Sequence, residues 1–266
     1  MKKSKILTLI MVCVMAITSI FSLTACGAKA EDVKKITDAG KIVVGITDYE
    51  PMDYKDESGK WIGFDAELAE KFAAQLGVTC EFVEINWNNK VAEIKSGQID
   101  LIWNGMTASK KLGKQIDFSV SYAKNAQVAV VKSNSAIASK ADIAAAKVTA
   151  EAGSAGETVA EDEGFKNYVP AESQEKALIE VLSGTSEVAI IDITMAQSVI
   201  GKGSYADLKI VADVSYGDEI FAVGLRKNSD LKAVLDAFLK AEYKNGTIGE
   251  LALKYGVGIN TEALAD

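Results

Sequence analysis

Three consecutive stretches decide the fold class: KIVVGI at residues 41–46, DAELAEKFAAQLG at residues 65–77 and VTCEFVEI at residues 78–85. The first and third are short apolar runs rich in β-branched residues, which is typical of buried strands. The second has apolar residues at helical spacing and ends at a glycine, which is typical of an amphipathic helix. Strand, helix and strand in this order predict an α/β fold built on a parallel sheet.

The same alternation continues along the chain and partly repeats itself. EIKSG at residues 93–97 leads into an apolar run at 99–103, and EVLSG at 180–184 leads into another at 188–191. A short helix is expected at 91–96. This repeat predicts two similar α/β lobes. A helix that ends in Ser-Gly before a strand is, however, also a common way for unrelated helices to end.

The C-terminal tail has the pattern of two helices. Apolar residues at helical spacing begin at Leu231, and Asn245-Gly246 predicts the end of that helix. Thr247 and Glu250 have the spacing of a capping box, which predicts a last helix that reaches about Gly256.

The first residues have the three parts of a signal peptide: lysines at 2, 3 and 5, an apolar segment at 6–23 and small residues at 24–28. A membrane-spanning helix is the alternative, but the segment is short, contains serines and threonines, and lacks a basic flank at its end. The quartet LTAC at residues 23–26 resembles the bacterial lipobox. This resemblance implies a signal peptide at 1–25, a lipidated Cys26 that anchors the protein to the outer face of the cell membrane, and a linker at 26–38.

Composition excludes several classes of function. The formal net charge is −8 and becomes −11 once the three signal-peptide lysines are removed, which argues against nucleic acid as a partner. The chain has no histidine, so Ser-His and Cys-His nucleophile pairs and most transition-metal sites are excluded. With Cys13 in the signal peptide and Cys26 lipidated, Cys80 has no disulfide partner and is expected to be a buried thiol. We expect no metal and no cofactor.

Six short motifs occur along the chain, and their order and spacing together are more specific than any one of them. They are WIGFD at 61–65, SGQID at 96–100, Gly105-Met106-Thr107, IDFS at 116–119, Gly153-Ser154 and Arg226-Lys227. Together they resemble the bacterial family 3 solute-binding proteins, the extracytoplasmic receptors of polar amino-acid ABC transporters. The resemblance implies a two-lobed, type II periplasmic-binding-protein-like fold that closes on its ligand. Lobe one would comprise residues 39–128 and 218–266, and lobe two residues 129–217.

The resemblance also implies a ligand site in the cleft between the lobes, where open α/β sheets bind ligands. The expected ligand-binding residues are Asp48, Tyr49, Trp87, Gly105, Thr107, Ser154, Ala155 and Asp192. Asp192 ends an apolar run, so its carboxylate either caps the next helix or holds a ligand ammonium. Asp48 has the same two interpretations, and Tyr49 is expected to line the side-chain pocket.

The remaining site residues each have a structural alternative. Trp87 is either a core residue or an aromatic platform for the ligand, and the polar residues after it favour an exposed platform. Gly105 and Thr107 are expected to bond the ligand's amine and carboxylate through backbone and hydroxyl. Ser154 and Ala155 begin a predicted helix whose free N–H groups would bind a carboxylate, with Ser154 also a possible N-cap.

One position departs from the family pattern. Family members that bind α-amino acids place an arginine where this chain has Leu112, and the only arginine here is Arg226, at a position outside the cleft. Lysine cannot reproduce the bidentate fork of arginine. Three outcomes stay open: Lys110 or Lys111 binds the carboxylate, the ligand lacks an α-carboxylate, or the ligand is not an amino acid.

These inferences predict a substrate-binding protein of an ABC transporter and not an enzyme. It would act as a monomer, capture a small polar amino acid or related amine, and deliver it to a membrane permease. One alternative is a dehydratase-like or murein-cleaving enzyme on the same fold, with Asp48 or Asp192 as its catalytic carboxylate. The other is a tethered sensory module.

Overall fold

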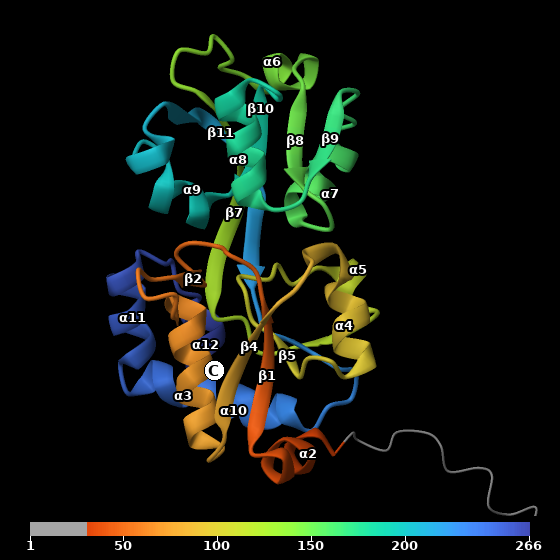
Figure 1. Cartoon of the computed structure of the whole chain (residues 1–266), viewed down its shortest axis with the longest axis vertical. Helices are drawn as coiled ribbons and strands as arrows, with labels where there is room; N and C mark the ends of the chain where they lie inside the picture. Colours follow the sequence, from red (N-terminus) through yellow and green to blue (C-terminus); the bar gives the residue numbers. More distant parts are fainter. Residues whose placement is uncertain (1–30) are drawn as a thin grey trace, which may run out of the picture. The chain divides into compact units, whose positions relative to one another are not determined.

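Two five-stranded sheets organise residues 31–266, the part of the chain that this computed structural model describes (Figure 1). The lobe one sheet has the order β4-β1-β5-β12-β6 and the lobe two sheet the order β11-β7-β10-β8-β9. The lobe one strands are β1 (Lys41–Ile46), β4 (Thr79–Glu84), β5 (Leu101–Ile102), β6 (Asp117–Phe118) and β12 (Gly224–Leu225). The lobe two strands are β7 (Ala123–Lys132), β8 (Val148–Glu151), β9 (Tyr168–Ala171), β10 (Val188–Asp192) and β11 (Leu208–Phe221). A small hairpin adds β2 (Tyr54–Lys55) and β3 (Trp61–Ile62).

Helices accompany both sheets. With lobe one are α2 (Asp32–Ala39), α3 (Phe64–Gln75), α4 (Lys90–Ser96), α5 (Lys110–Gly113), α10 (Leu231–Lys244), α11 (Thr247–Tyr255) and α12 (Thr261–Ala265), with the 3-10 turn η1 (Trp87–Asn89). With lobe two are α6 (Lys140–Ala145), α7 (Ala155–Asp162), α8 (Gln174–Ser183) and α9 (Ile193–Val199), with η2 (Gly203–Tyr205). None of the helices between residues 31 and 266 has the length and apolar character needed to cross a bilayer.

Most predicted elements are confirmed within two residues. β1 has the predicted bounds, and it pairs in parallel with both β4 and β5, as the strand-helix-strand pattern requires. The predicted capping box of α11 is wrong, because Gly246 is the N-cap residue and Thr247 is already helical. Asn245, which precedes the N-cap, accepts a hydrogen bond from the Thr247 N–H through its Oδ1 at 3.0 Å.

Strands β7 and β11 connect the two sheets. They pair antiparallel from Ala123–Phe221 to Lys132–Leu208, with register shifts between residues 210 and 218 of β11. Figure 1 shows both strands running from one sheet to the other. Because strand ladders bend at such irregularities, β11 is expected to bend in this segment between the two sheets. The exact division of the chain at residues 128 and 218 remains our proposal.

Helix α2 corrects the expectation of a linker at residues 26–38, since residues from Asp32 onward are folded into lobe one. Ile36 is 1% exposed in the core, and the Asp230 carboxylate accepts a hydrogen bond from the Val33 N–H at 3.0 Å. Polar composition suggested a spacer, but Ile36 lies in the core and Val33 packs against it. The predicted lipidation site, Cys26, lies outside the described residues.

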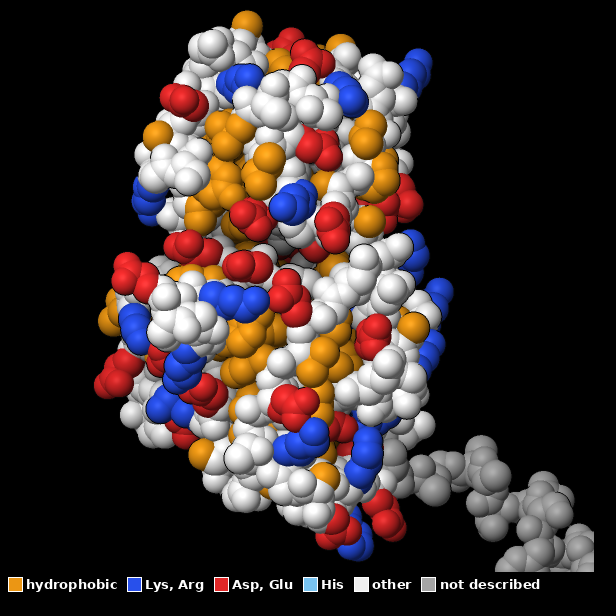
Figure 2. Space-filling model, in the orientation of Figure 1, with side chains coloured by type: hydrophobic (Ala, Val, Ile, Leu, Met, Phe, Trp, Pro, Cys, Tyr) orange, Lys and Arg blue, Asp and Glu red, His pale blue; other side chains and the backbone are white. Residues whose placement is uncertain are grey.

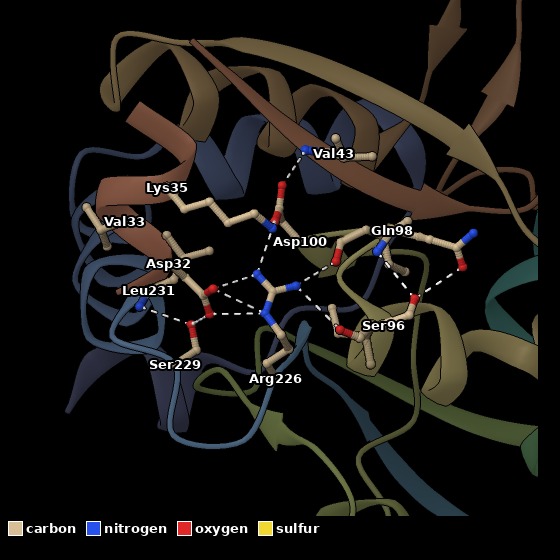
Figure 3. Close-up of polar contacts among 12 residues, drawn as sticks. Asp32, Val33, Lys35, Val43, Ser96, Gln98, Asp100, Arg226, Ser229 and Leu231 are labelled. Atoms are coloured by element: carbon tan, nitrogen blue, oxygen red, sulfur yellow. Dashed lines mark hydrogen bonds and ion pairs between the residues drawn. The ribbon is translucent and has the colours of Figure 1, made fainter. Parts of the chain in front are cut away.

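Arg226 attaches helix α2 to the sheet (Figure 3). Its Nη2 lies 2.8 Å from Asp32 and 3.0 Å from Asp100, and its Nη1 donates to the Ile99 carbonyl at 2.7 Å. Ser229 donates a further hydrogen bond to Asp32 at 2.6 Å. The guanidinium is therefore a structural centre that satisfies two buried carboxylates, and it lies away from the cleft.

We expect Arg226→Lys to destabilise the fold by about 2 kcal/mol or more, because an ammonium cannot make the bidentate and carbonyl contacts together and leaves buried acceptors unpaired. Thermal unfolding measures the effect. Lys35→Arg is the matched control, because Lys35 contacts Asp100 from a largely exposed position, at 3.4 Å. An unchanged midpoint for Arg226→Lys would contradict the structural role.

Candidate functional site

A cavity of about 760 Å³ lies between the two sheets, within the size range of small-molecule sites. Segments that follow β1 and β5 line it from lobe one, and the carboxyl ends of β8 and β10 line it from lobe two, with Glu219 of β11 beside the crossover. In the space-filling view, acidic side chains gather along the boundary between the lobes (Figure 2). Open α/β sheets commonly bind ligands at this edge.

Asp192 lies at the floor of the cavity with 6% of its surface exposed. Its carboxylate accepts hydrogen bonds from Gln127 Nε2 at 2.6 Å and Gln174 Nε2 at 2.5 Å, and also from the Asn125 amide. Asp192 is the N-cap residue of α9 by position, but its side chain makes no capping bond. Burial, with the nearby charge of Glu219, raises the pKa of Asp192 to about 6. Of the two interpretations, the structure therefore excludes helix capping by this carboxylate.

Glu219 is a cavity residue that sequence reasoning missed. Its Oε2 accepts hydrogen bonds from Asn125 at 2.9 Å, Gln127 at 3.0 Å and Thr107 Oγ1 at 3.0 Å. The Thr107 hydroxyl lines the cavity as expected, but here it donates to the protein's own carboxylate. Glu219 stands on a long strand with exposed polar neighbours, so the sequence carried no local signal for it.

Lys90 is a second missed residue and contacts both lobes. Its Nζ donates to the Gly153 carbonyl of lobe two at 2.7 Å and to the Trp87 carbonyl at 3.1 Å, and the side chain is 4% exposed. Burial lowers the pKa of Lys90 to about 8, against the opposing effect of Glu151 and Glu157. A lysine in the polar run after Trp87 gave no sign of burial.

Trp87 does not form the expected exposed platform. The indole is 8% exposed and packs in a hydrophobic cluster with Ile94 and Ile99, although it lines the cavity. Lys90 Nζ lies 4.6 Å from the ring centroid. The cation–π contact expected for a ligand is therefore already made by this protein's own ammonium.

Ser154 is the N-cap of α7, and Ala155 begins the helix. Ser154 Oγ accepts from the Glu157 N–H at 3.2 Å, while Glu157 Oε2 accepts from the Gly153 N–H at 2.7 Å. Both Ser154 and Ala155 line the cavity. The end of the helix that was expected to receive a ligand carboxylate thus already has a carboxylate of its own.

Glu151 is the third missed residue and the most unusual. Glu151 is the last residue of β8, as Asp192 is the last residue of β10. This shared position at the end of a strand could have identified Glu151 as a site residue from the sequence. The side chain is 4% exposed, lines the cavity and makes no hydrogen bond with any residue between 31 and 266. Burial, together with the charge of Asp192, raises the pKa of Glu151 to about 8.

The remaining expected site residues differ in their placement. Asp48 is exposed and does not line the cavity, although its neighbours Thr47 and Tyr49 do, so we leave it out of the proposed site. Tyr49 is 3% exposed and lines the cavity with a hydroxyl that has no partner among residues 31–266. Gly105 lines the cavity, but its N–H donates to Asp65 at 2.6 Å and is not available to a ligand.

Leu112 lines the cavity as a half-buried residue at the position where the family places arginine. Lys111 lines the rim of the cavity from an exposed position, and Lys110 does not line it. No group of three or more His, Cys, Asp or Glu side chains between residues 31 and 266 is arranged to hold a metal ion.

Gly153 permits the close approach of the two lobes at the cavity. Its φ is +76°, and a Cβ there would lie 2.9 Å from Asn88 Cα of lobe one. We expect Gly153→Ala to weaken ligand binding roughly tenfold, because a backbone clash of this kind opposes the closed arrangement. Isothermal titration calorimetry measures the loss.

Gly201→Ala is the matched control for this change. Gly201 has φ +79° with nothing within 4 Å of the added Cβ, so the backbone strain is the same without the clash. Equal affinities for the two variants would show that the contact between Gly153 and Asn88 is irrelevant to binding.

Comparisons with known proteins agree with this geometry. Residues 42–258 match the family model of bacterial extracellular solute-binding proteins, family 3. The arginine-binding extracellular protein ArtP of Bacillus subtilis (strain 168) is 30% identical over 246 residues, which cover 90% of this chain and 94% of that protein.

Two solved structures extend the likeness to the fold. A histidine-bound substrate-binding protein of an ABC uptake transporter from Streptococcus pneumoniae superposes with a TM-score of 0.79 at 28% identity, and the match covers 85% of this chain and 96% of that one. An ancestral amino acid-binding protein, AncCDT-1, a precursor of cyclohexadienyl dehydratase, superposes with a TM-score of 0.77 at 28% identity, covering 84% and 98%. The predicted two-lobed fold class is confirmed.

These relatives are amino-acid-binding proteins, and the structural likeness covers both lobes and the cleft between them. The family match spans both sheets and ends only a few residues before the C-terminus. The chain therefore belongs to the bacterial extracellular solute-binding proteins, family 3.

Proposed function

We propose that this protein captures a small polar amino acid or a related amine between its lobes and delivers it to an ABC permease in the membrane. The observation that carries the proposal is Asp192, a buried carboxylate at the cavity floor oriented by three side-chain amides. A carboxylate fixed in this way is a strong acceptor for a ligand ammonium. Tyr49, Trp87, Gly105, Thr107, Ser154 and Ala155 complete the proposed site.

Ligand binding would favour the closed arrangement only through contacts with both lobes. Thr107 and Lys90 belong to the lobe one side of the cavity, and Ser154 and Asp192 to the lobe two side. Contacts between the lobes already exist at Lys90–Gly153 and at Ser198–Glu50, the latter at 3.1 Å. A ligand that contacts both lobes would therefore stabilise the closed arrangement further, in addition to these two hydrogen bonds.

Isothermal titration with a panel of amino acids and polyamines tests the proposal. Binding of at least one ligand, with a matching rise in the thermal midpoint, is the expected result. The absence of both heat and thermal shift across the panel would count against a binding protein for this ligand class.

We also propose export of the protein and anchoring through Cys26. Support comes from the signal-peptide pattern and the lipobox-like quartet at residues 23–26. Metabolic labelling with a radioactive fatty acid should mark the wild type and not Cys26→Ala, and the variant should leave the membrane fraction. Equal labelling of the wild type and Cys26→Ala would show that Cys26 is not the lipidated residue.

Binding of an ammonium ligand should weaken in acid. The ionised Asp192 is the acceptor, its pKa is about 6, and the groups that face it are Glu219, Glu151 and Tyr49. The affinity for a ligand with a single ammonium should be nearly constant above pH 7 and fall roughly tenfold at pH 5, where about 90% of the Asp192 carboxylate is protonated. Calorimetry at both pH values measures this, with thermal unfolding at pH 5 to establish that the fold persists. A pH-independent affinity would exclude Asp192 as the ammonium acceptor.

A further inference from the structure

Glu151 is a buried carboxylate without a partner in the cavity, and neither helix capping nor an ion pair explains it. Its Oε1 has no hydrogen-bond partner among the described residues, and the side chain is 96% shielded from solvent. An ionised group in this position is costly unless a cation or a set of donors compensates it. The high pKa of Glu151 agrees with the lack of such compensation.

The donors around the cavity are mostly engaged by the protein's own carboxylates. Thr107, Asn125 and Gln127 donate to Glu219, and the amides of residues 125, 127 and 174 donate to Asp192. The Gly153 N–H donates to Glu157. A ligand thus meets a surplus of acceptors, which suits a ligand rich in N–H donors.

Three carboxylates come from strands of the same sheet. Glu151, Asp192 and Glu219 stand on β8, β10 and β11, and the order of the sheet is β11-β7-β10-β8-β9. Asp192 and Glu219 lie close together, because the amides of Asn125 and Gln127 donate to both. Glu151 stands on the strand beside that of Asp192, so the cavity offers a second, separate acidic position for a ligand with two cationic groups.

The charges of four groups indicate how many cations the ligand should carry. When ionised, Glu151, Asp192 and Glu219 carry three negative charges, and Lys90, the buried lysine that lines the same cavity, reduces their sum to −2. The Lys90 Nζ already donates to two carbonyls. Two cationic groups on the ligand would neutralise the remaining charge.

A ligand carboxylate would be poorly compensated near these acidic groups. Leu112 stands where the family places a guanidinium, Lys111 is exposed, and Glu157 accepts a hydrogen bond from the Gly153 N–H just before α7. A carboxylate close to Glu151 and Asp192 would be repelled by them.

We propose that Glu151 is a second cation-binding position beside Asp192, and that the ligand is a linear aliphatic diamine or polyamine without a carboxylate. This inference rests on the proposed binding function and names the ligand class for the same cavity. Asp192 receives one ammonium, Glu151 receives another, and Glu219 adds its charge at the crossover.

Three matched probes test the ligand class by calorimetry: cadaverine, lysine, which adds an α-carboxylate to cadaverine, and n-pentylamine, which lacks one ammonium. Cadaverine should bind at least tenfold more tightly than either of the others. Lysine binding as tightly as cadaverine or more tightly would overturn the inference and leave the proposed function intact. If cadaverine, spermidine and every amino acid of the panel fail to bind, both the inferred ligand class and the proposed binding function are wrong.

Glu151→Gln tests the second position directly, with Glu172→Gln as the control for charge removal at an exposed residue outside the cavity. Cadaverine affinity should fall roughly 10- to 100-fold in Glu151→Gln, the cost of one charge-assisted contact, and stay unchanged in the control. n-Pentylamine, which needs only Asp192, should bind both variants within about threefold of wild type. Equal losses for the two amines, or no loss for cadaverine, would overturn the role of Glu151.

Discussion

Asp192→Asn is expected to lower ligand affinity by roughly 100-fold or more, because it removes the charged half of a desolvated ion pair with the ligand ammonium. The amides of Gln127 and Gln174 that orient the carboxylate would then face a neutral side chain. Calorimetry with the ligand that binds wild type most tightly measures the loss.

The protein should remain folded after this change. Because burial raises the pKa of Asp192 to about 6, above its value in the unfolded chain, its ionisation at neutral pH lowers the free energy of unfolding, and a neutral amide removes that cost. Thermal unfolding checks this, and Asp207→Asn, at an exposed position outside the cavity, is the control. A well-folded Asp192→Asn with an affinity within threefold of wild type would show that the ammonium lies elsewhere.

Leu112→Arg is expected to reverse the ligand preference. Leu112 lines the cavity at the position where the family places its carboxylate-binding arginine, and a guanidinium there could form a bidentate pair with an α-carboxylate. Affinity for lysine should rise roughly 10- to 100-fold, since such a contact is worth about 1.5–3 kcal/mol. Affinity for cadaverine should fall, because the new cation opposes its ammonium groups.

Lys111→Arg is the control for this gain, because it places a guanidinium one residue away on the exposed rim without adding charge. Calorimetry with lysine and cadaverine on both variants distinguishes an effect of the guanidinium's position at residue 112 from a general effect of an added arginine. An unchanged lysine affinity in Leu112→Arg would mean that residue 112 does not face the ligand, and that the placement of the cleft residues is wrong.

The candidate site shows which cavity residues could be predicted from local sequence patterns. Asp192, Tyr49, Gly105, Thr107, Ser154 and Ala155 were placed at the cavity from motifs that end strands or begin helices. Glu151 ends a strand in the same way and was overlooked, because no family motif marks it. Glu219 and Lys90 had no local signal, since the Thr107–Glu219 and Lys90–Gly153 contacts join residues more than 60 positions apart in the sequence.

Errors arose where burial depends on distant segments. The polar residues after Trp87 suggested exposure, but the indole packs against Ile94 and Ile99. The polar residues of α2 suggested a linker, but Arg226 and Asp230 hold that helix against lobe one from the other end of the chain. The partners of α2 lie near the other end of the chain, and those of Trp87 lie beyond the polar run that follows it.

The sequence by itself determined the strand and helix order, the family, the absence of histidine chemistry and the missing arginine at residue 112, because periodicity, composition and motif order are local or countable properties. Only the tertiary structure decided which charged groups share the cavity. Strand order brings the ends of β8, β10 and β11 to one edge, and the approach of the lobes at Gly153 buries Lys90 against them. Burial and proximity set the electrostatics of the site, and neither property exists until the chain is folded.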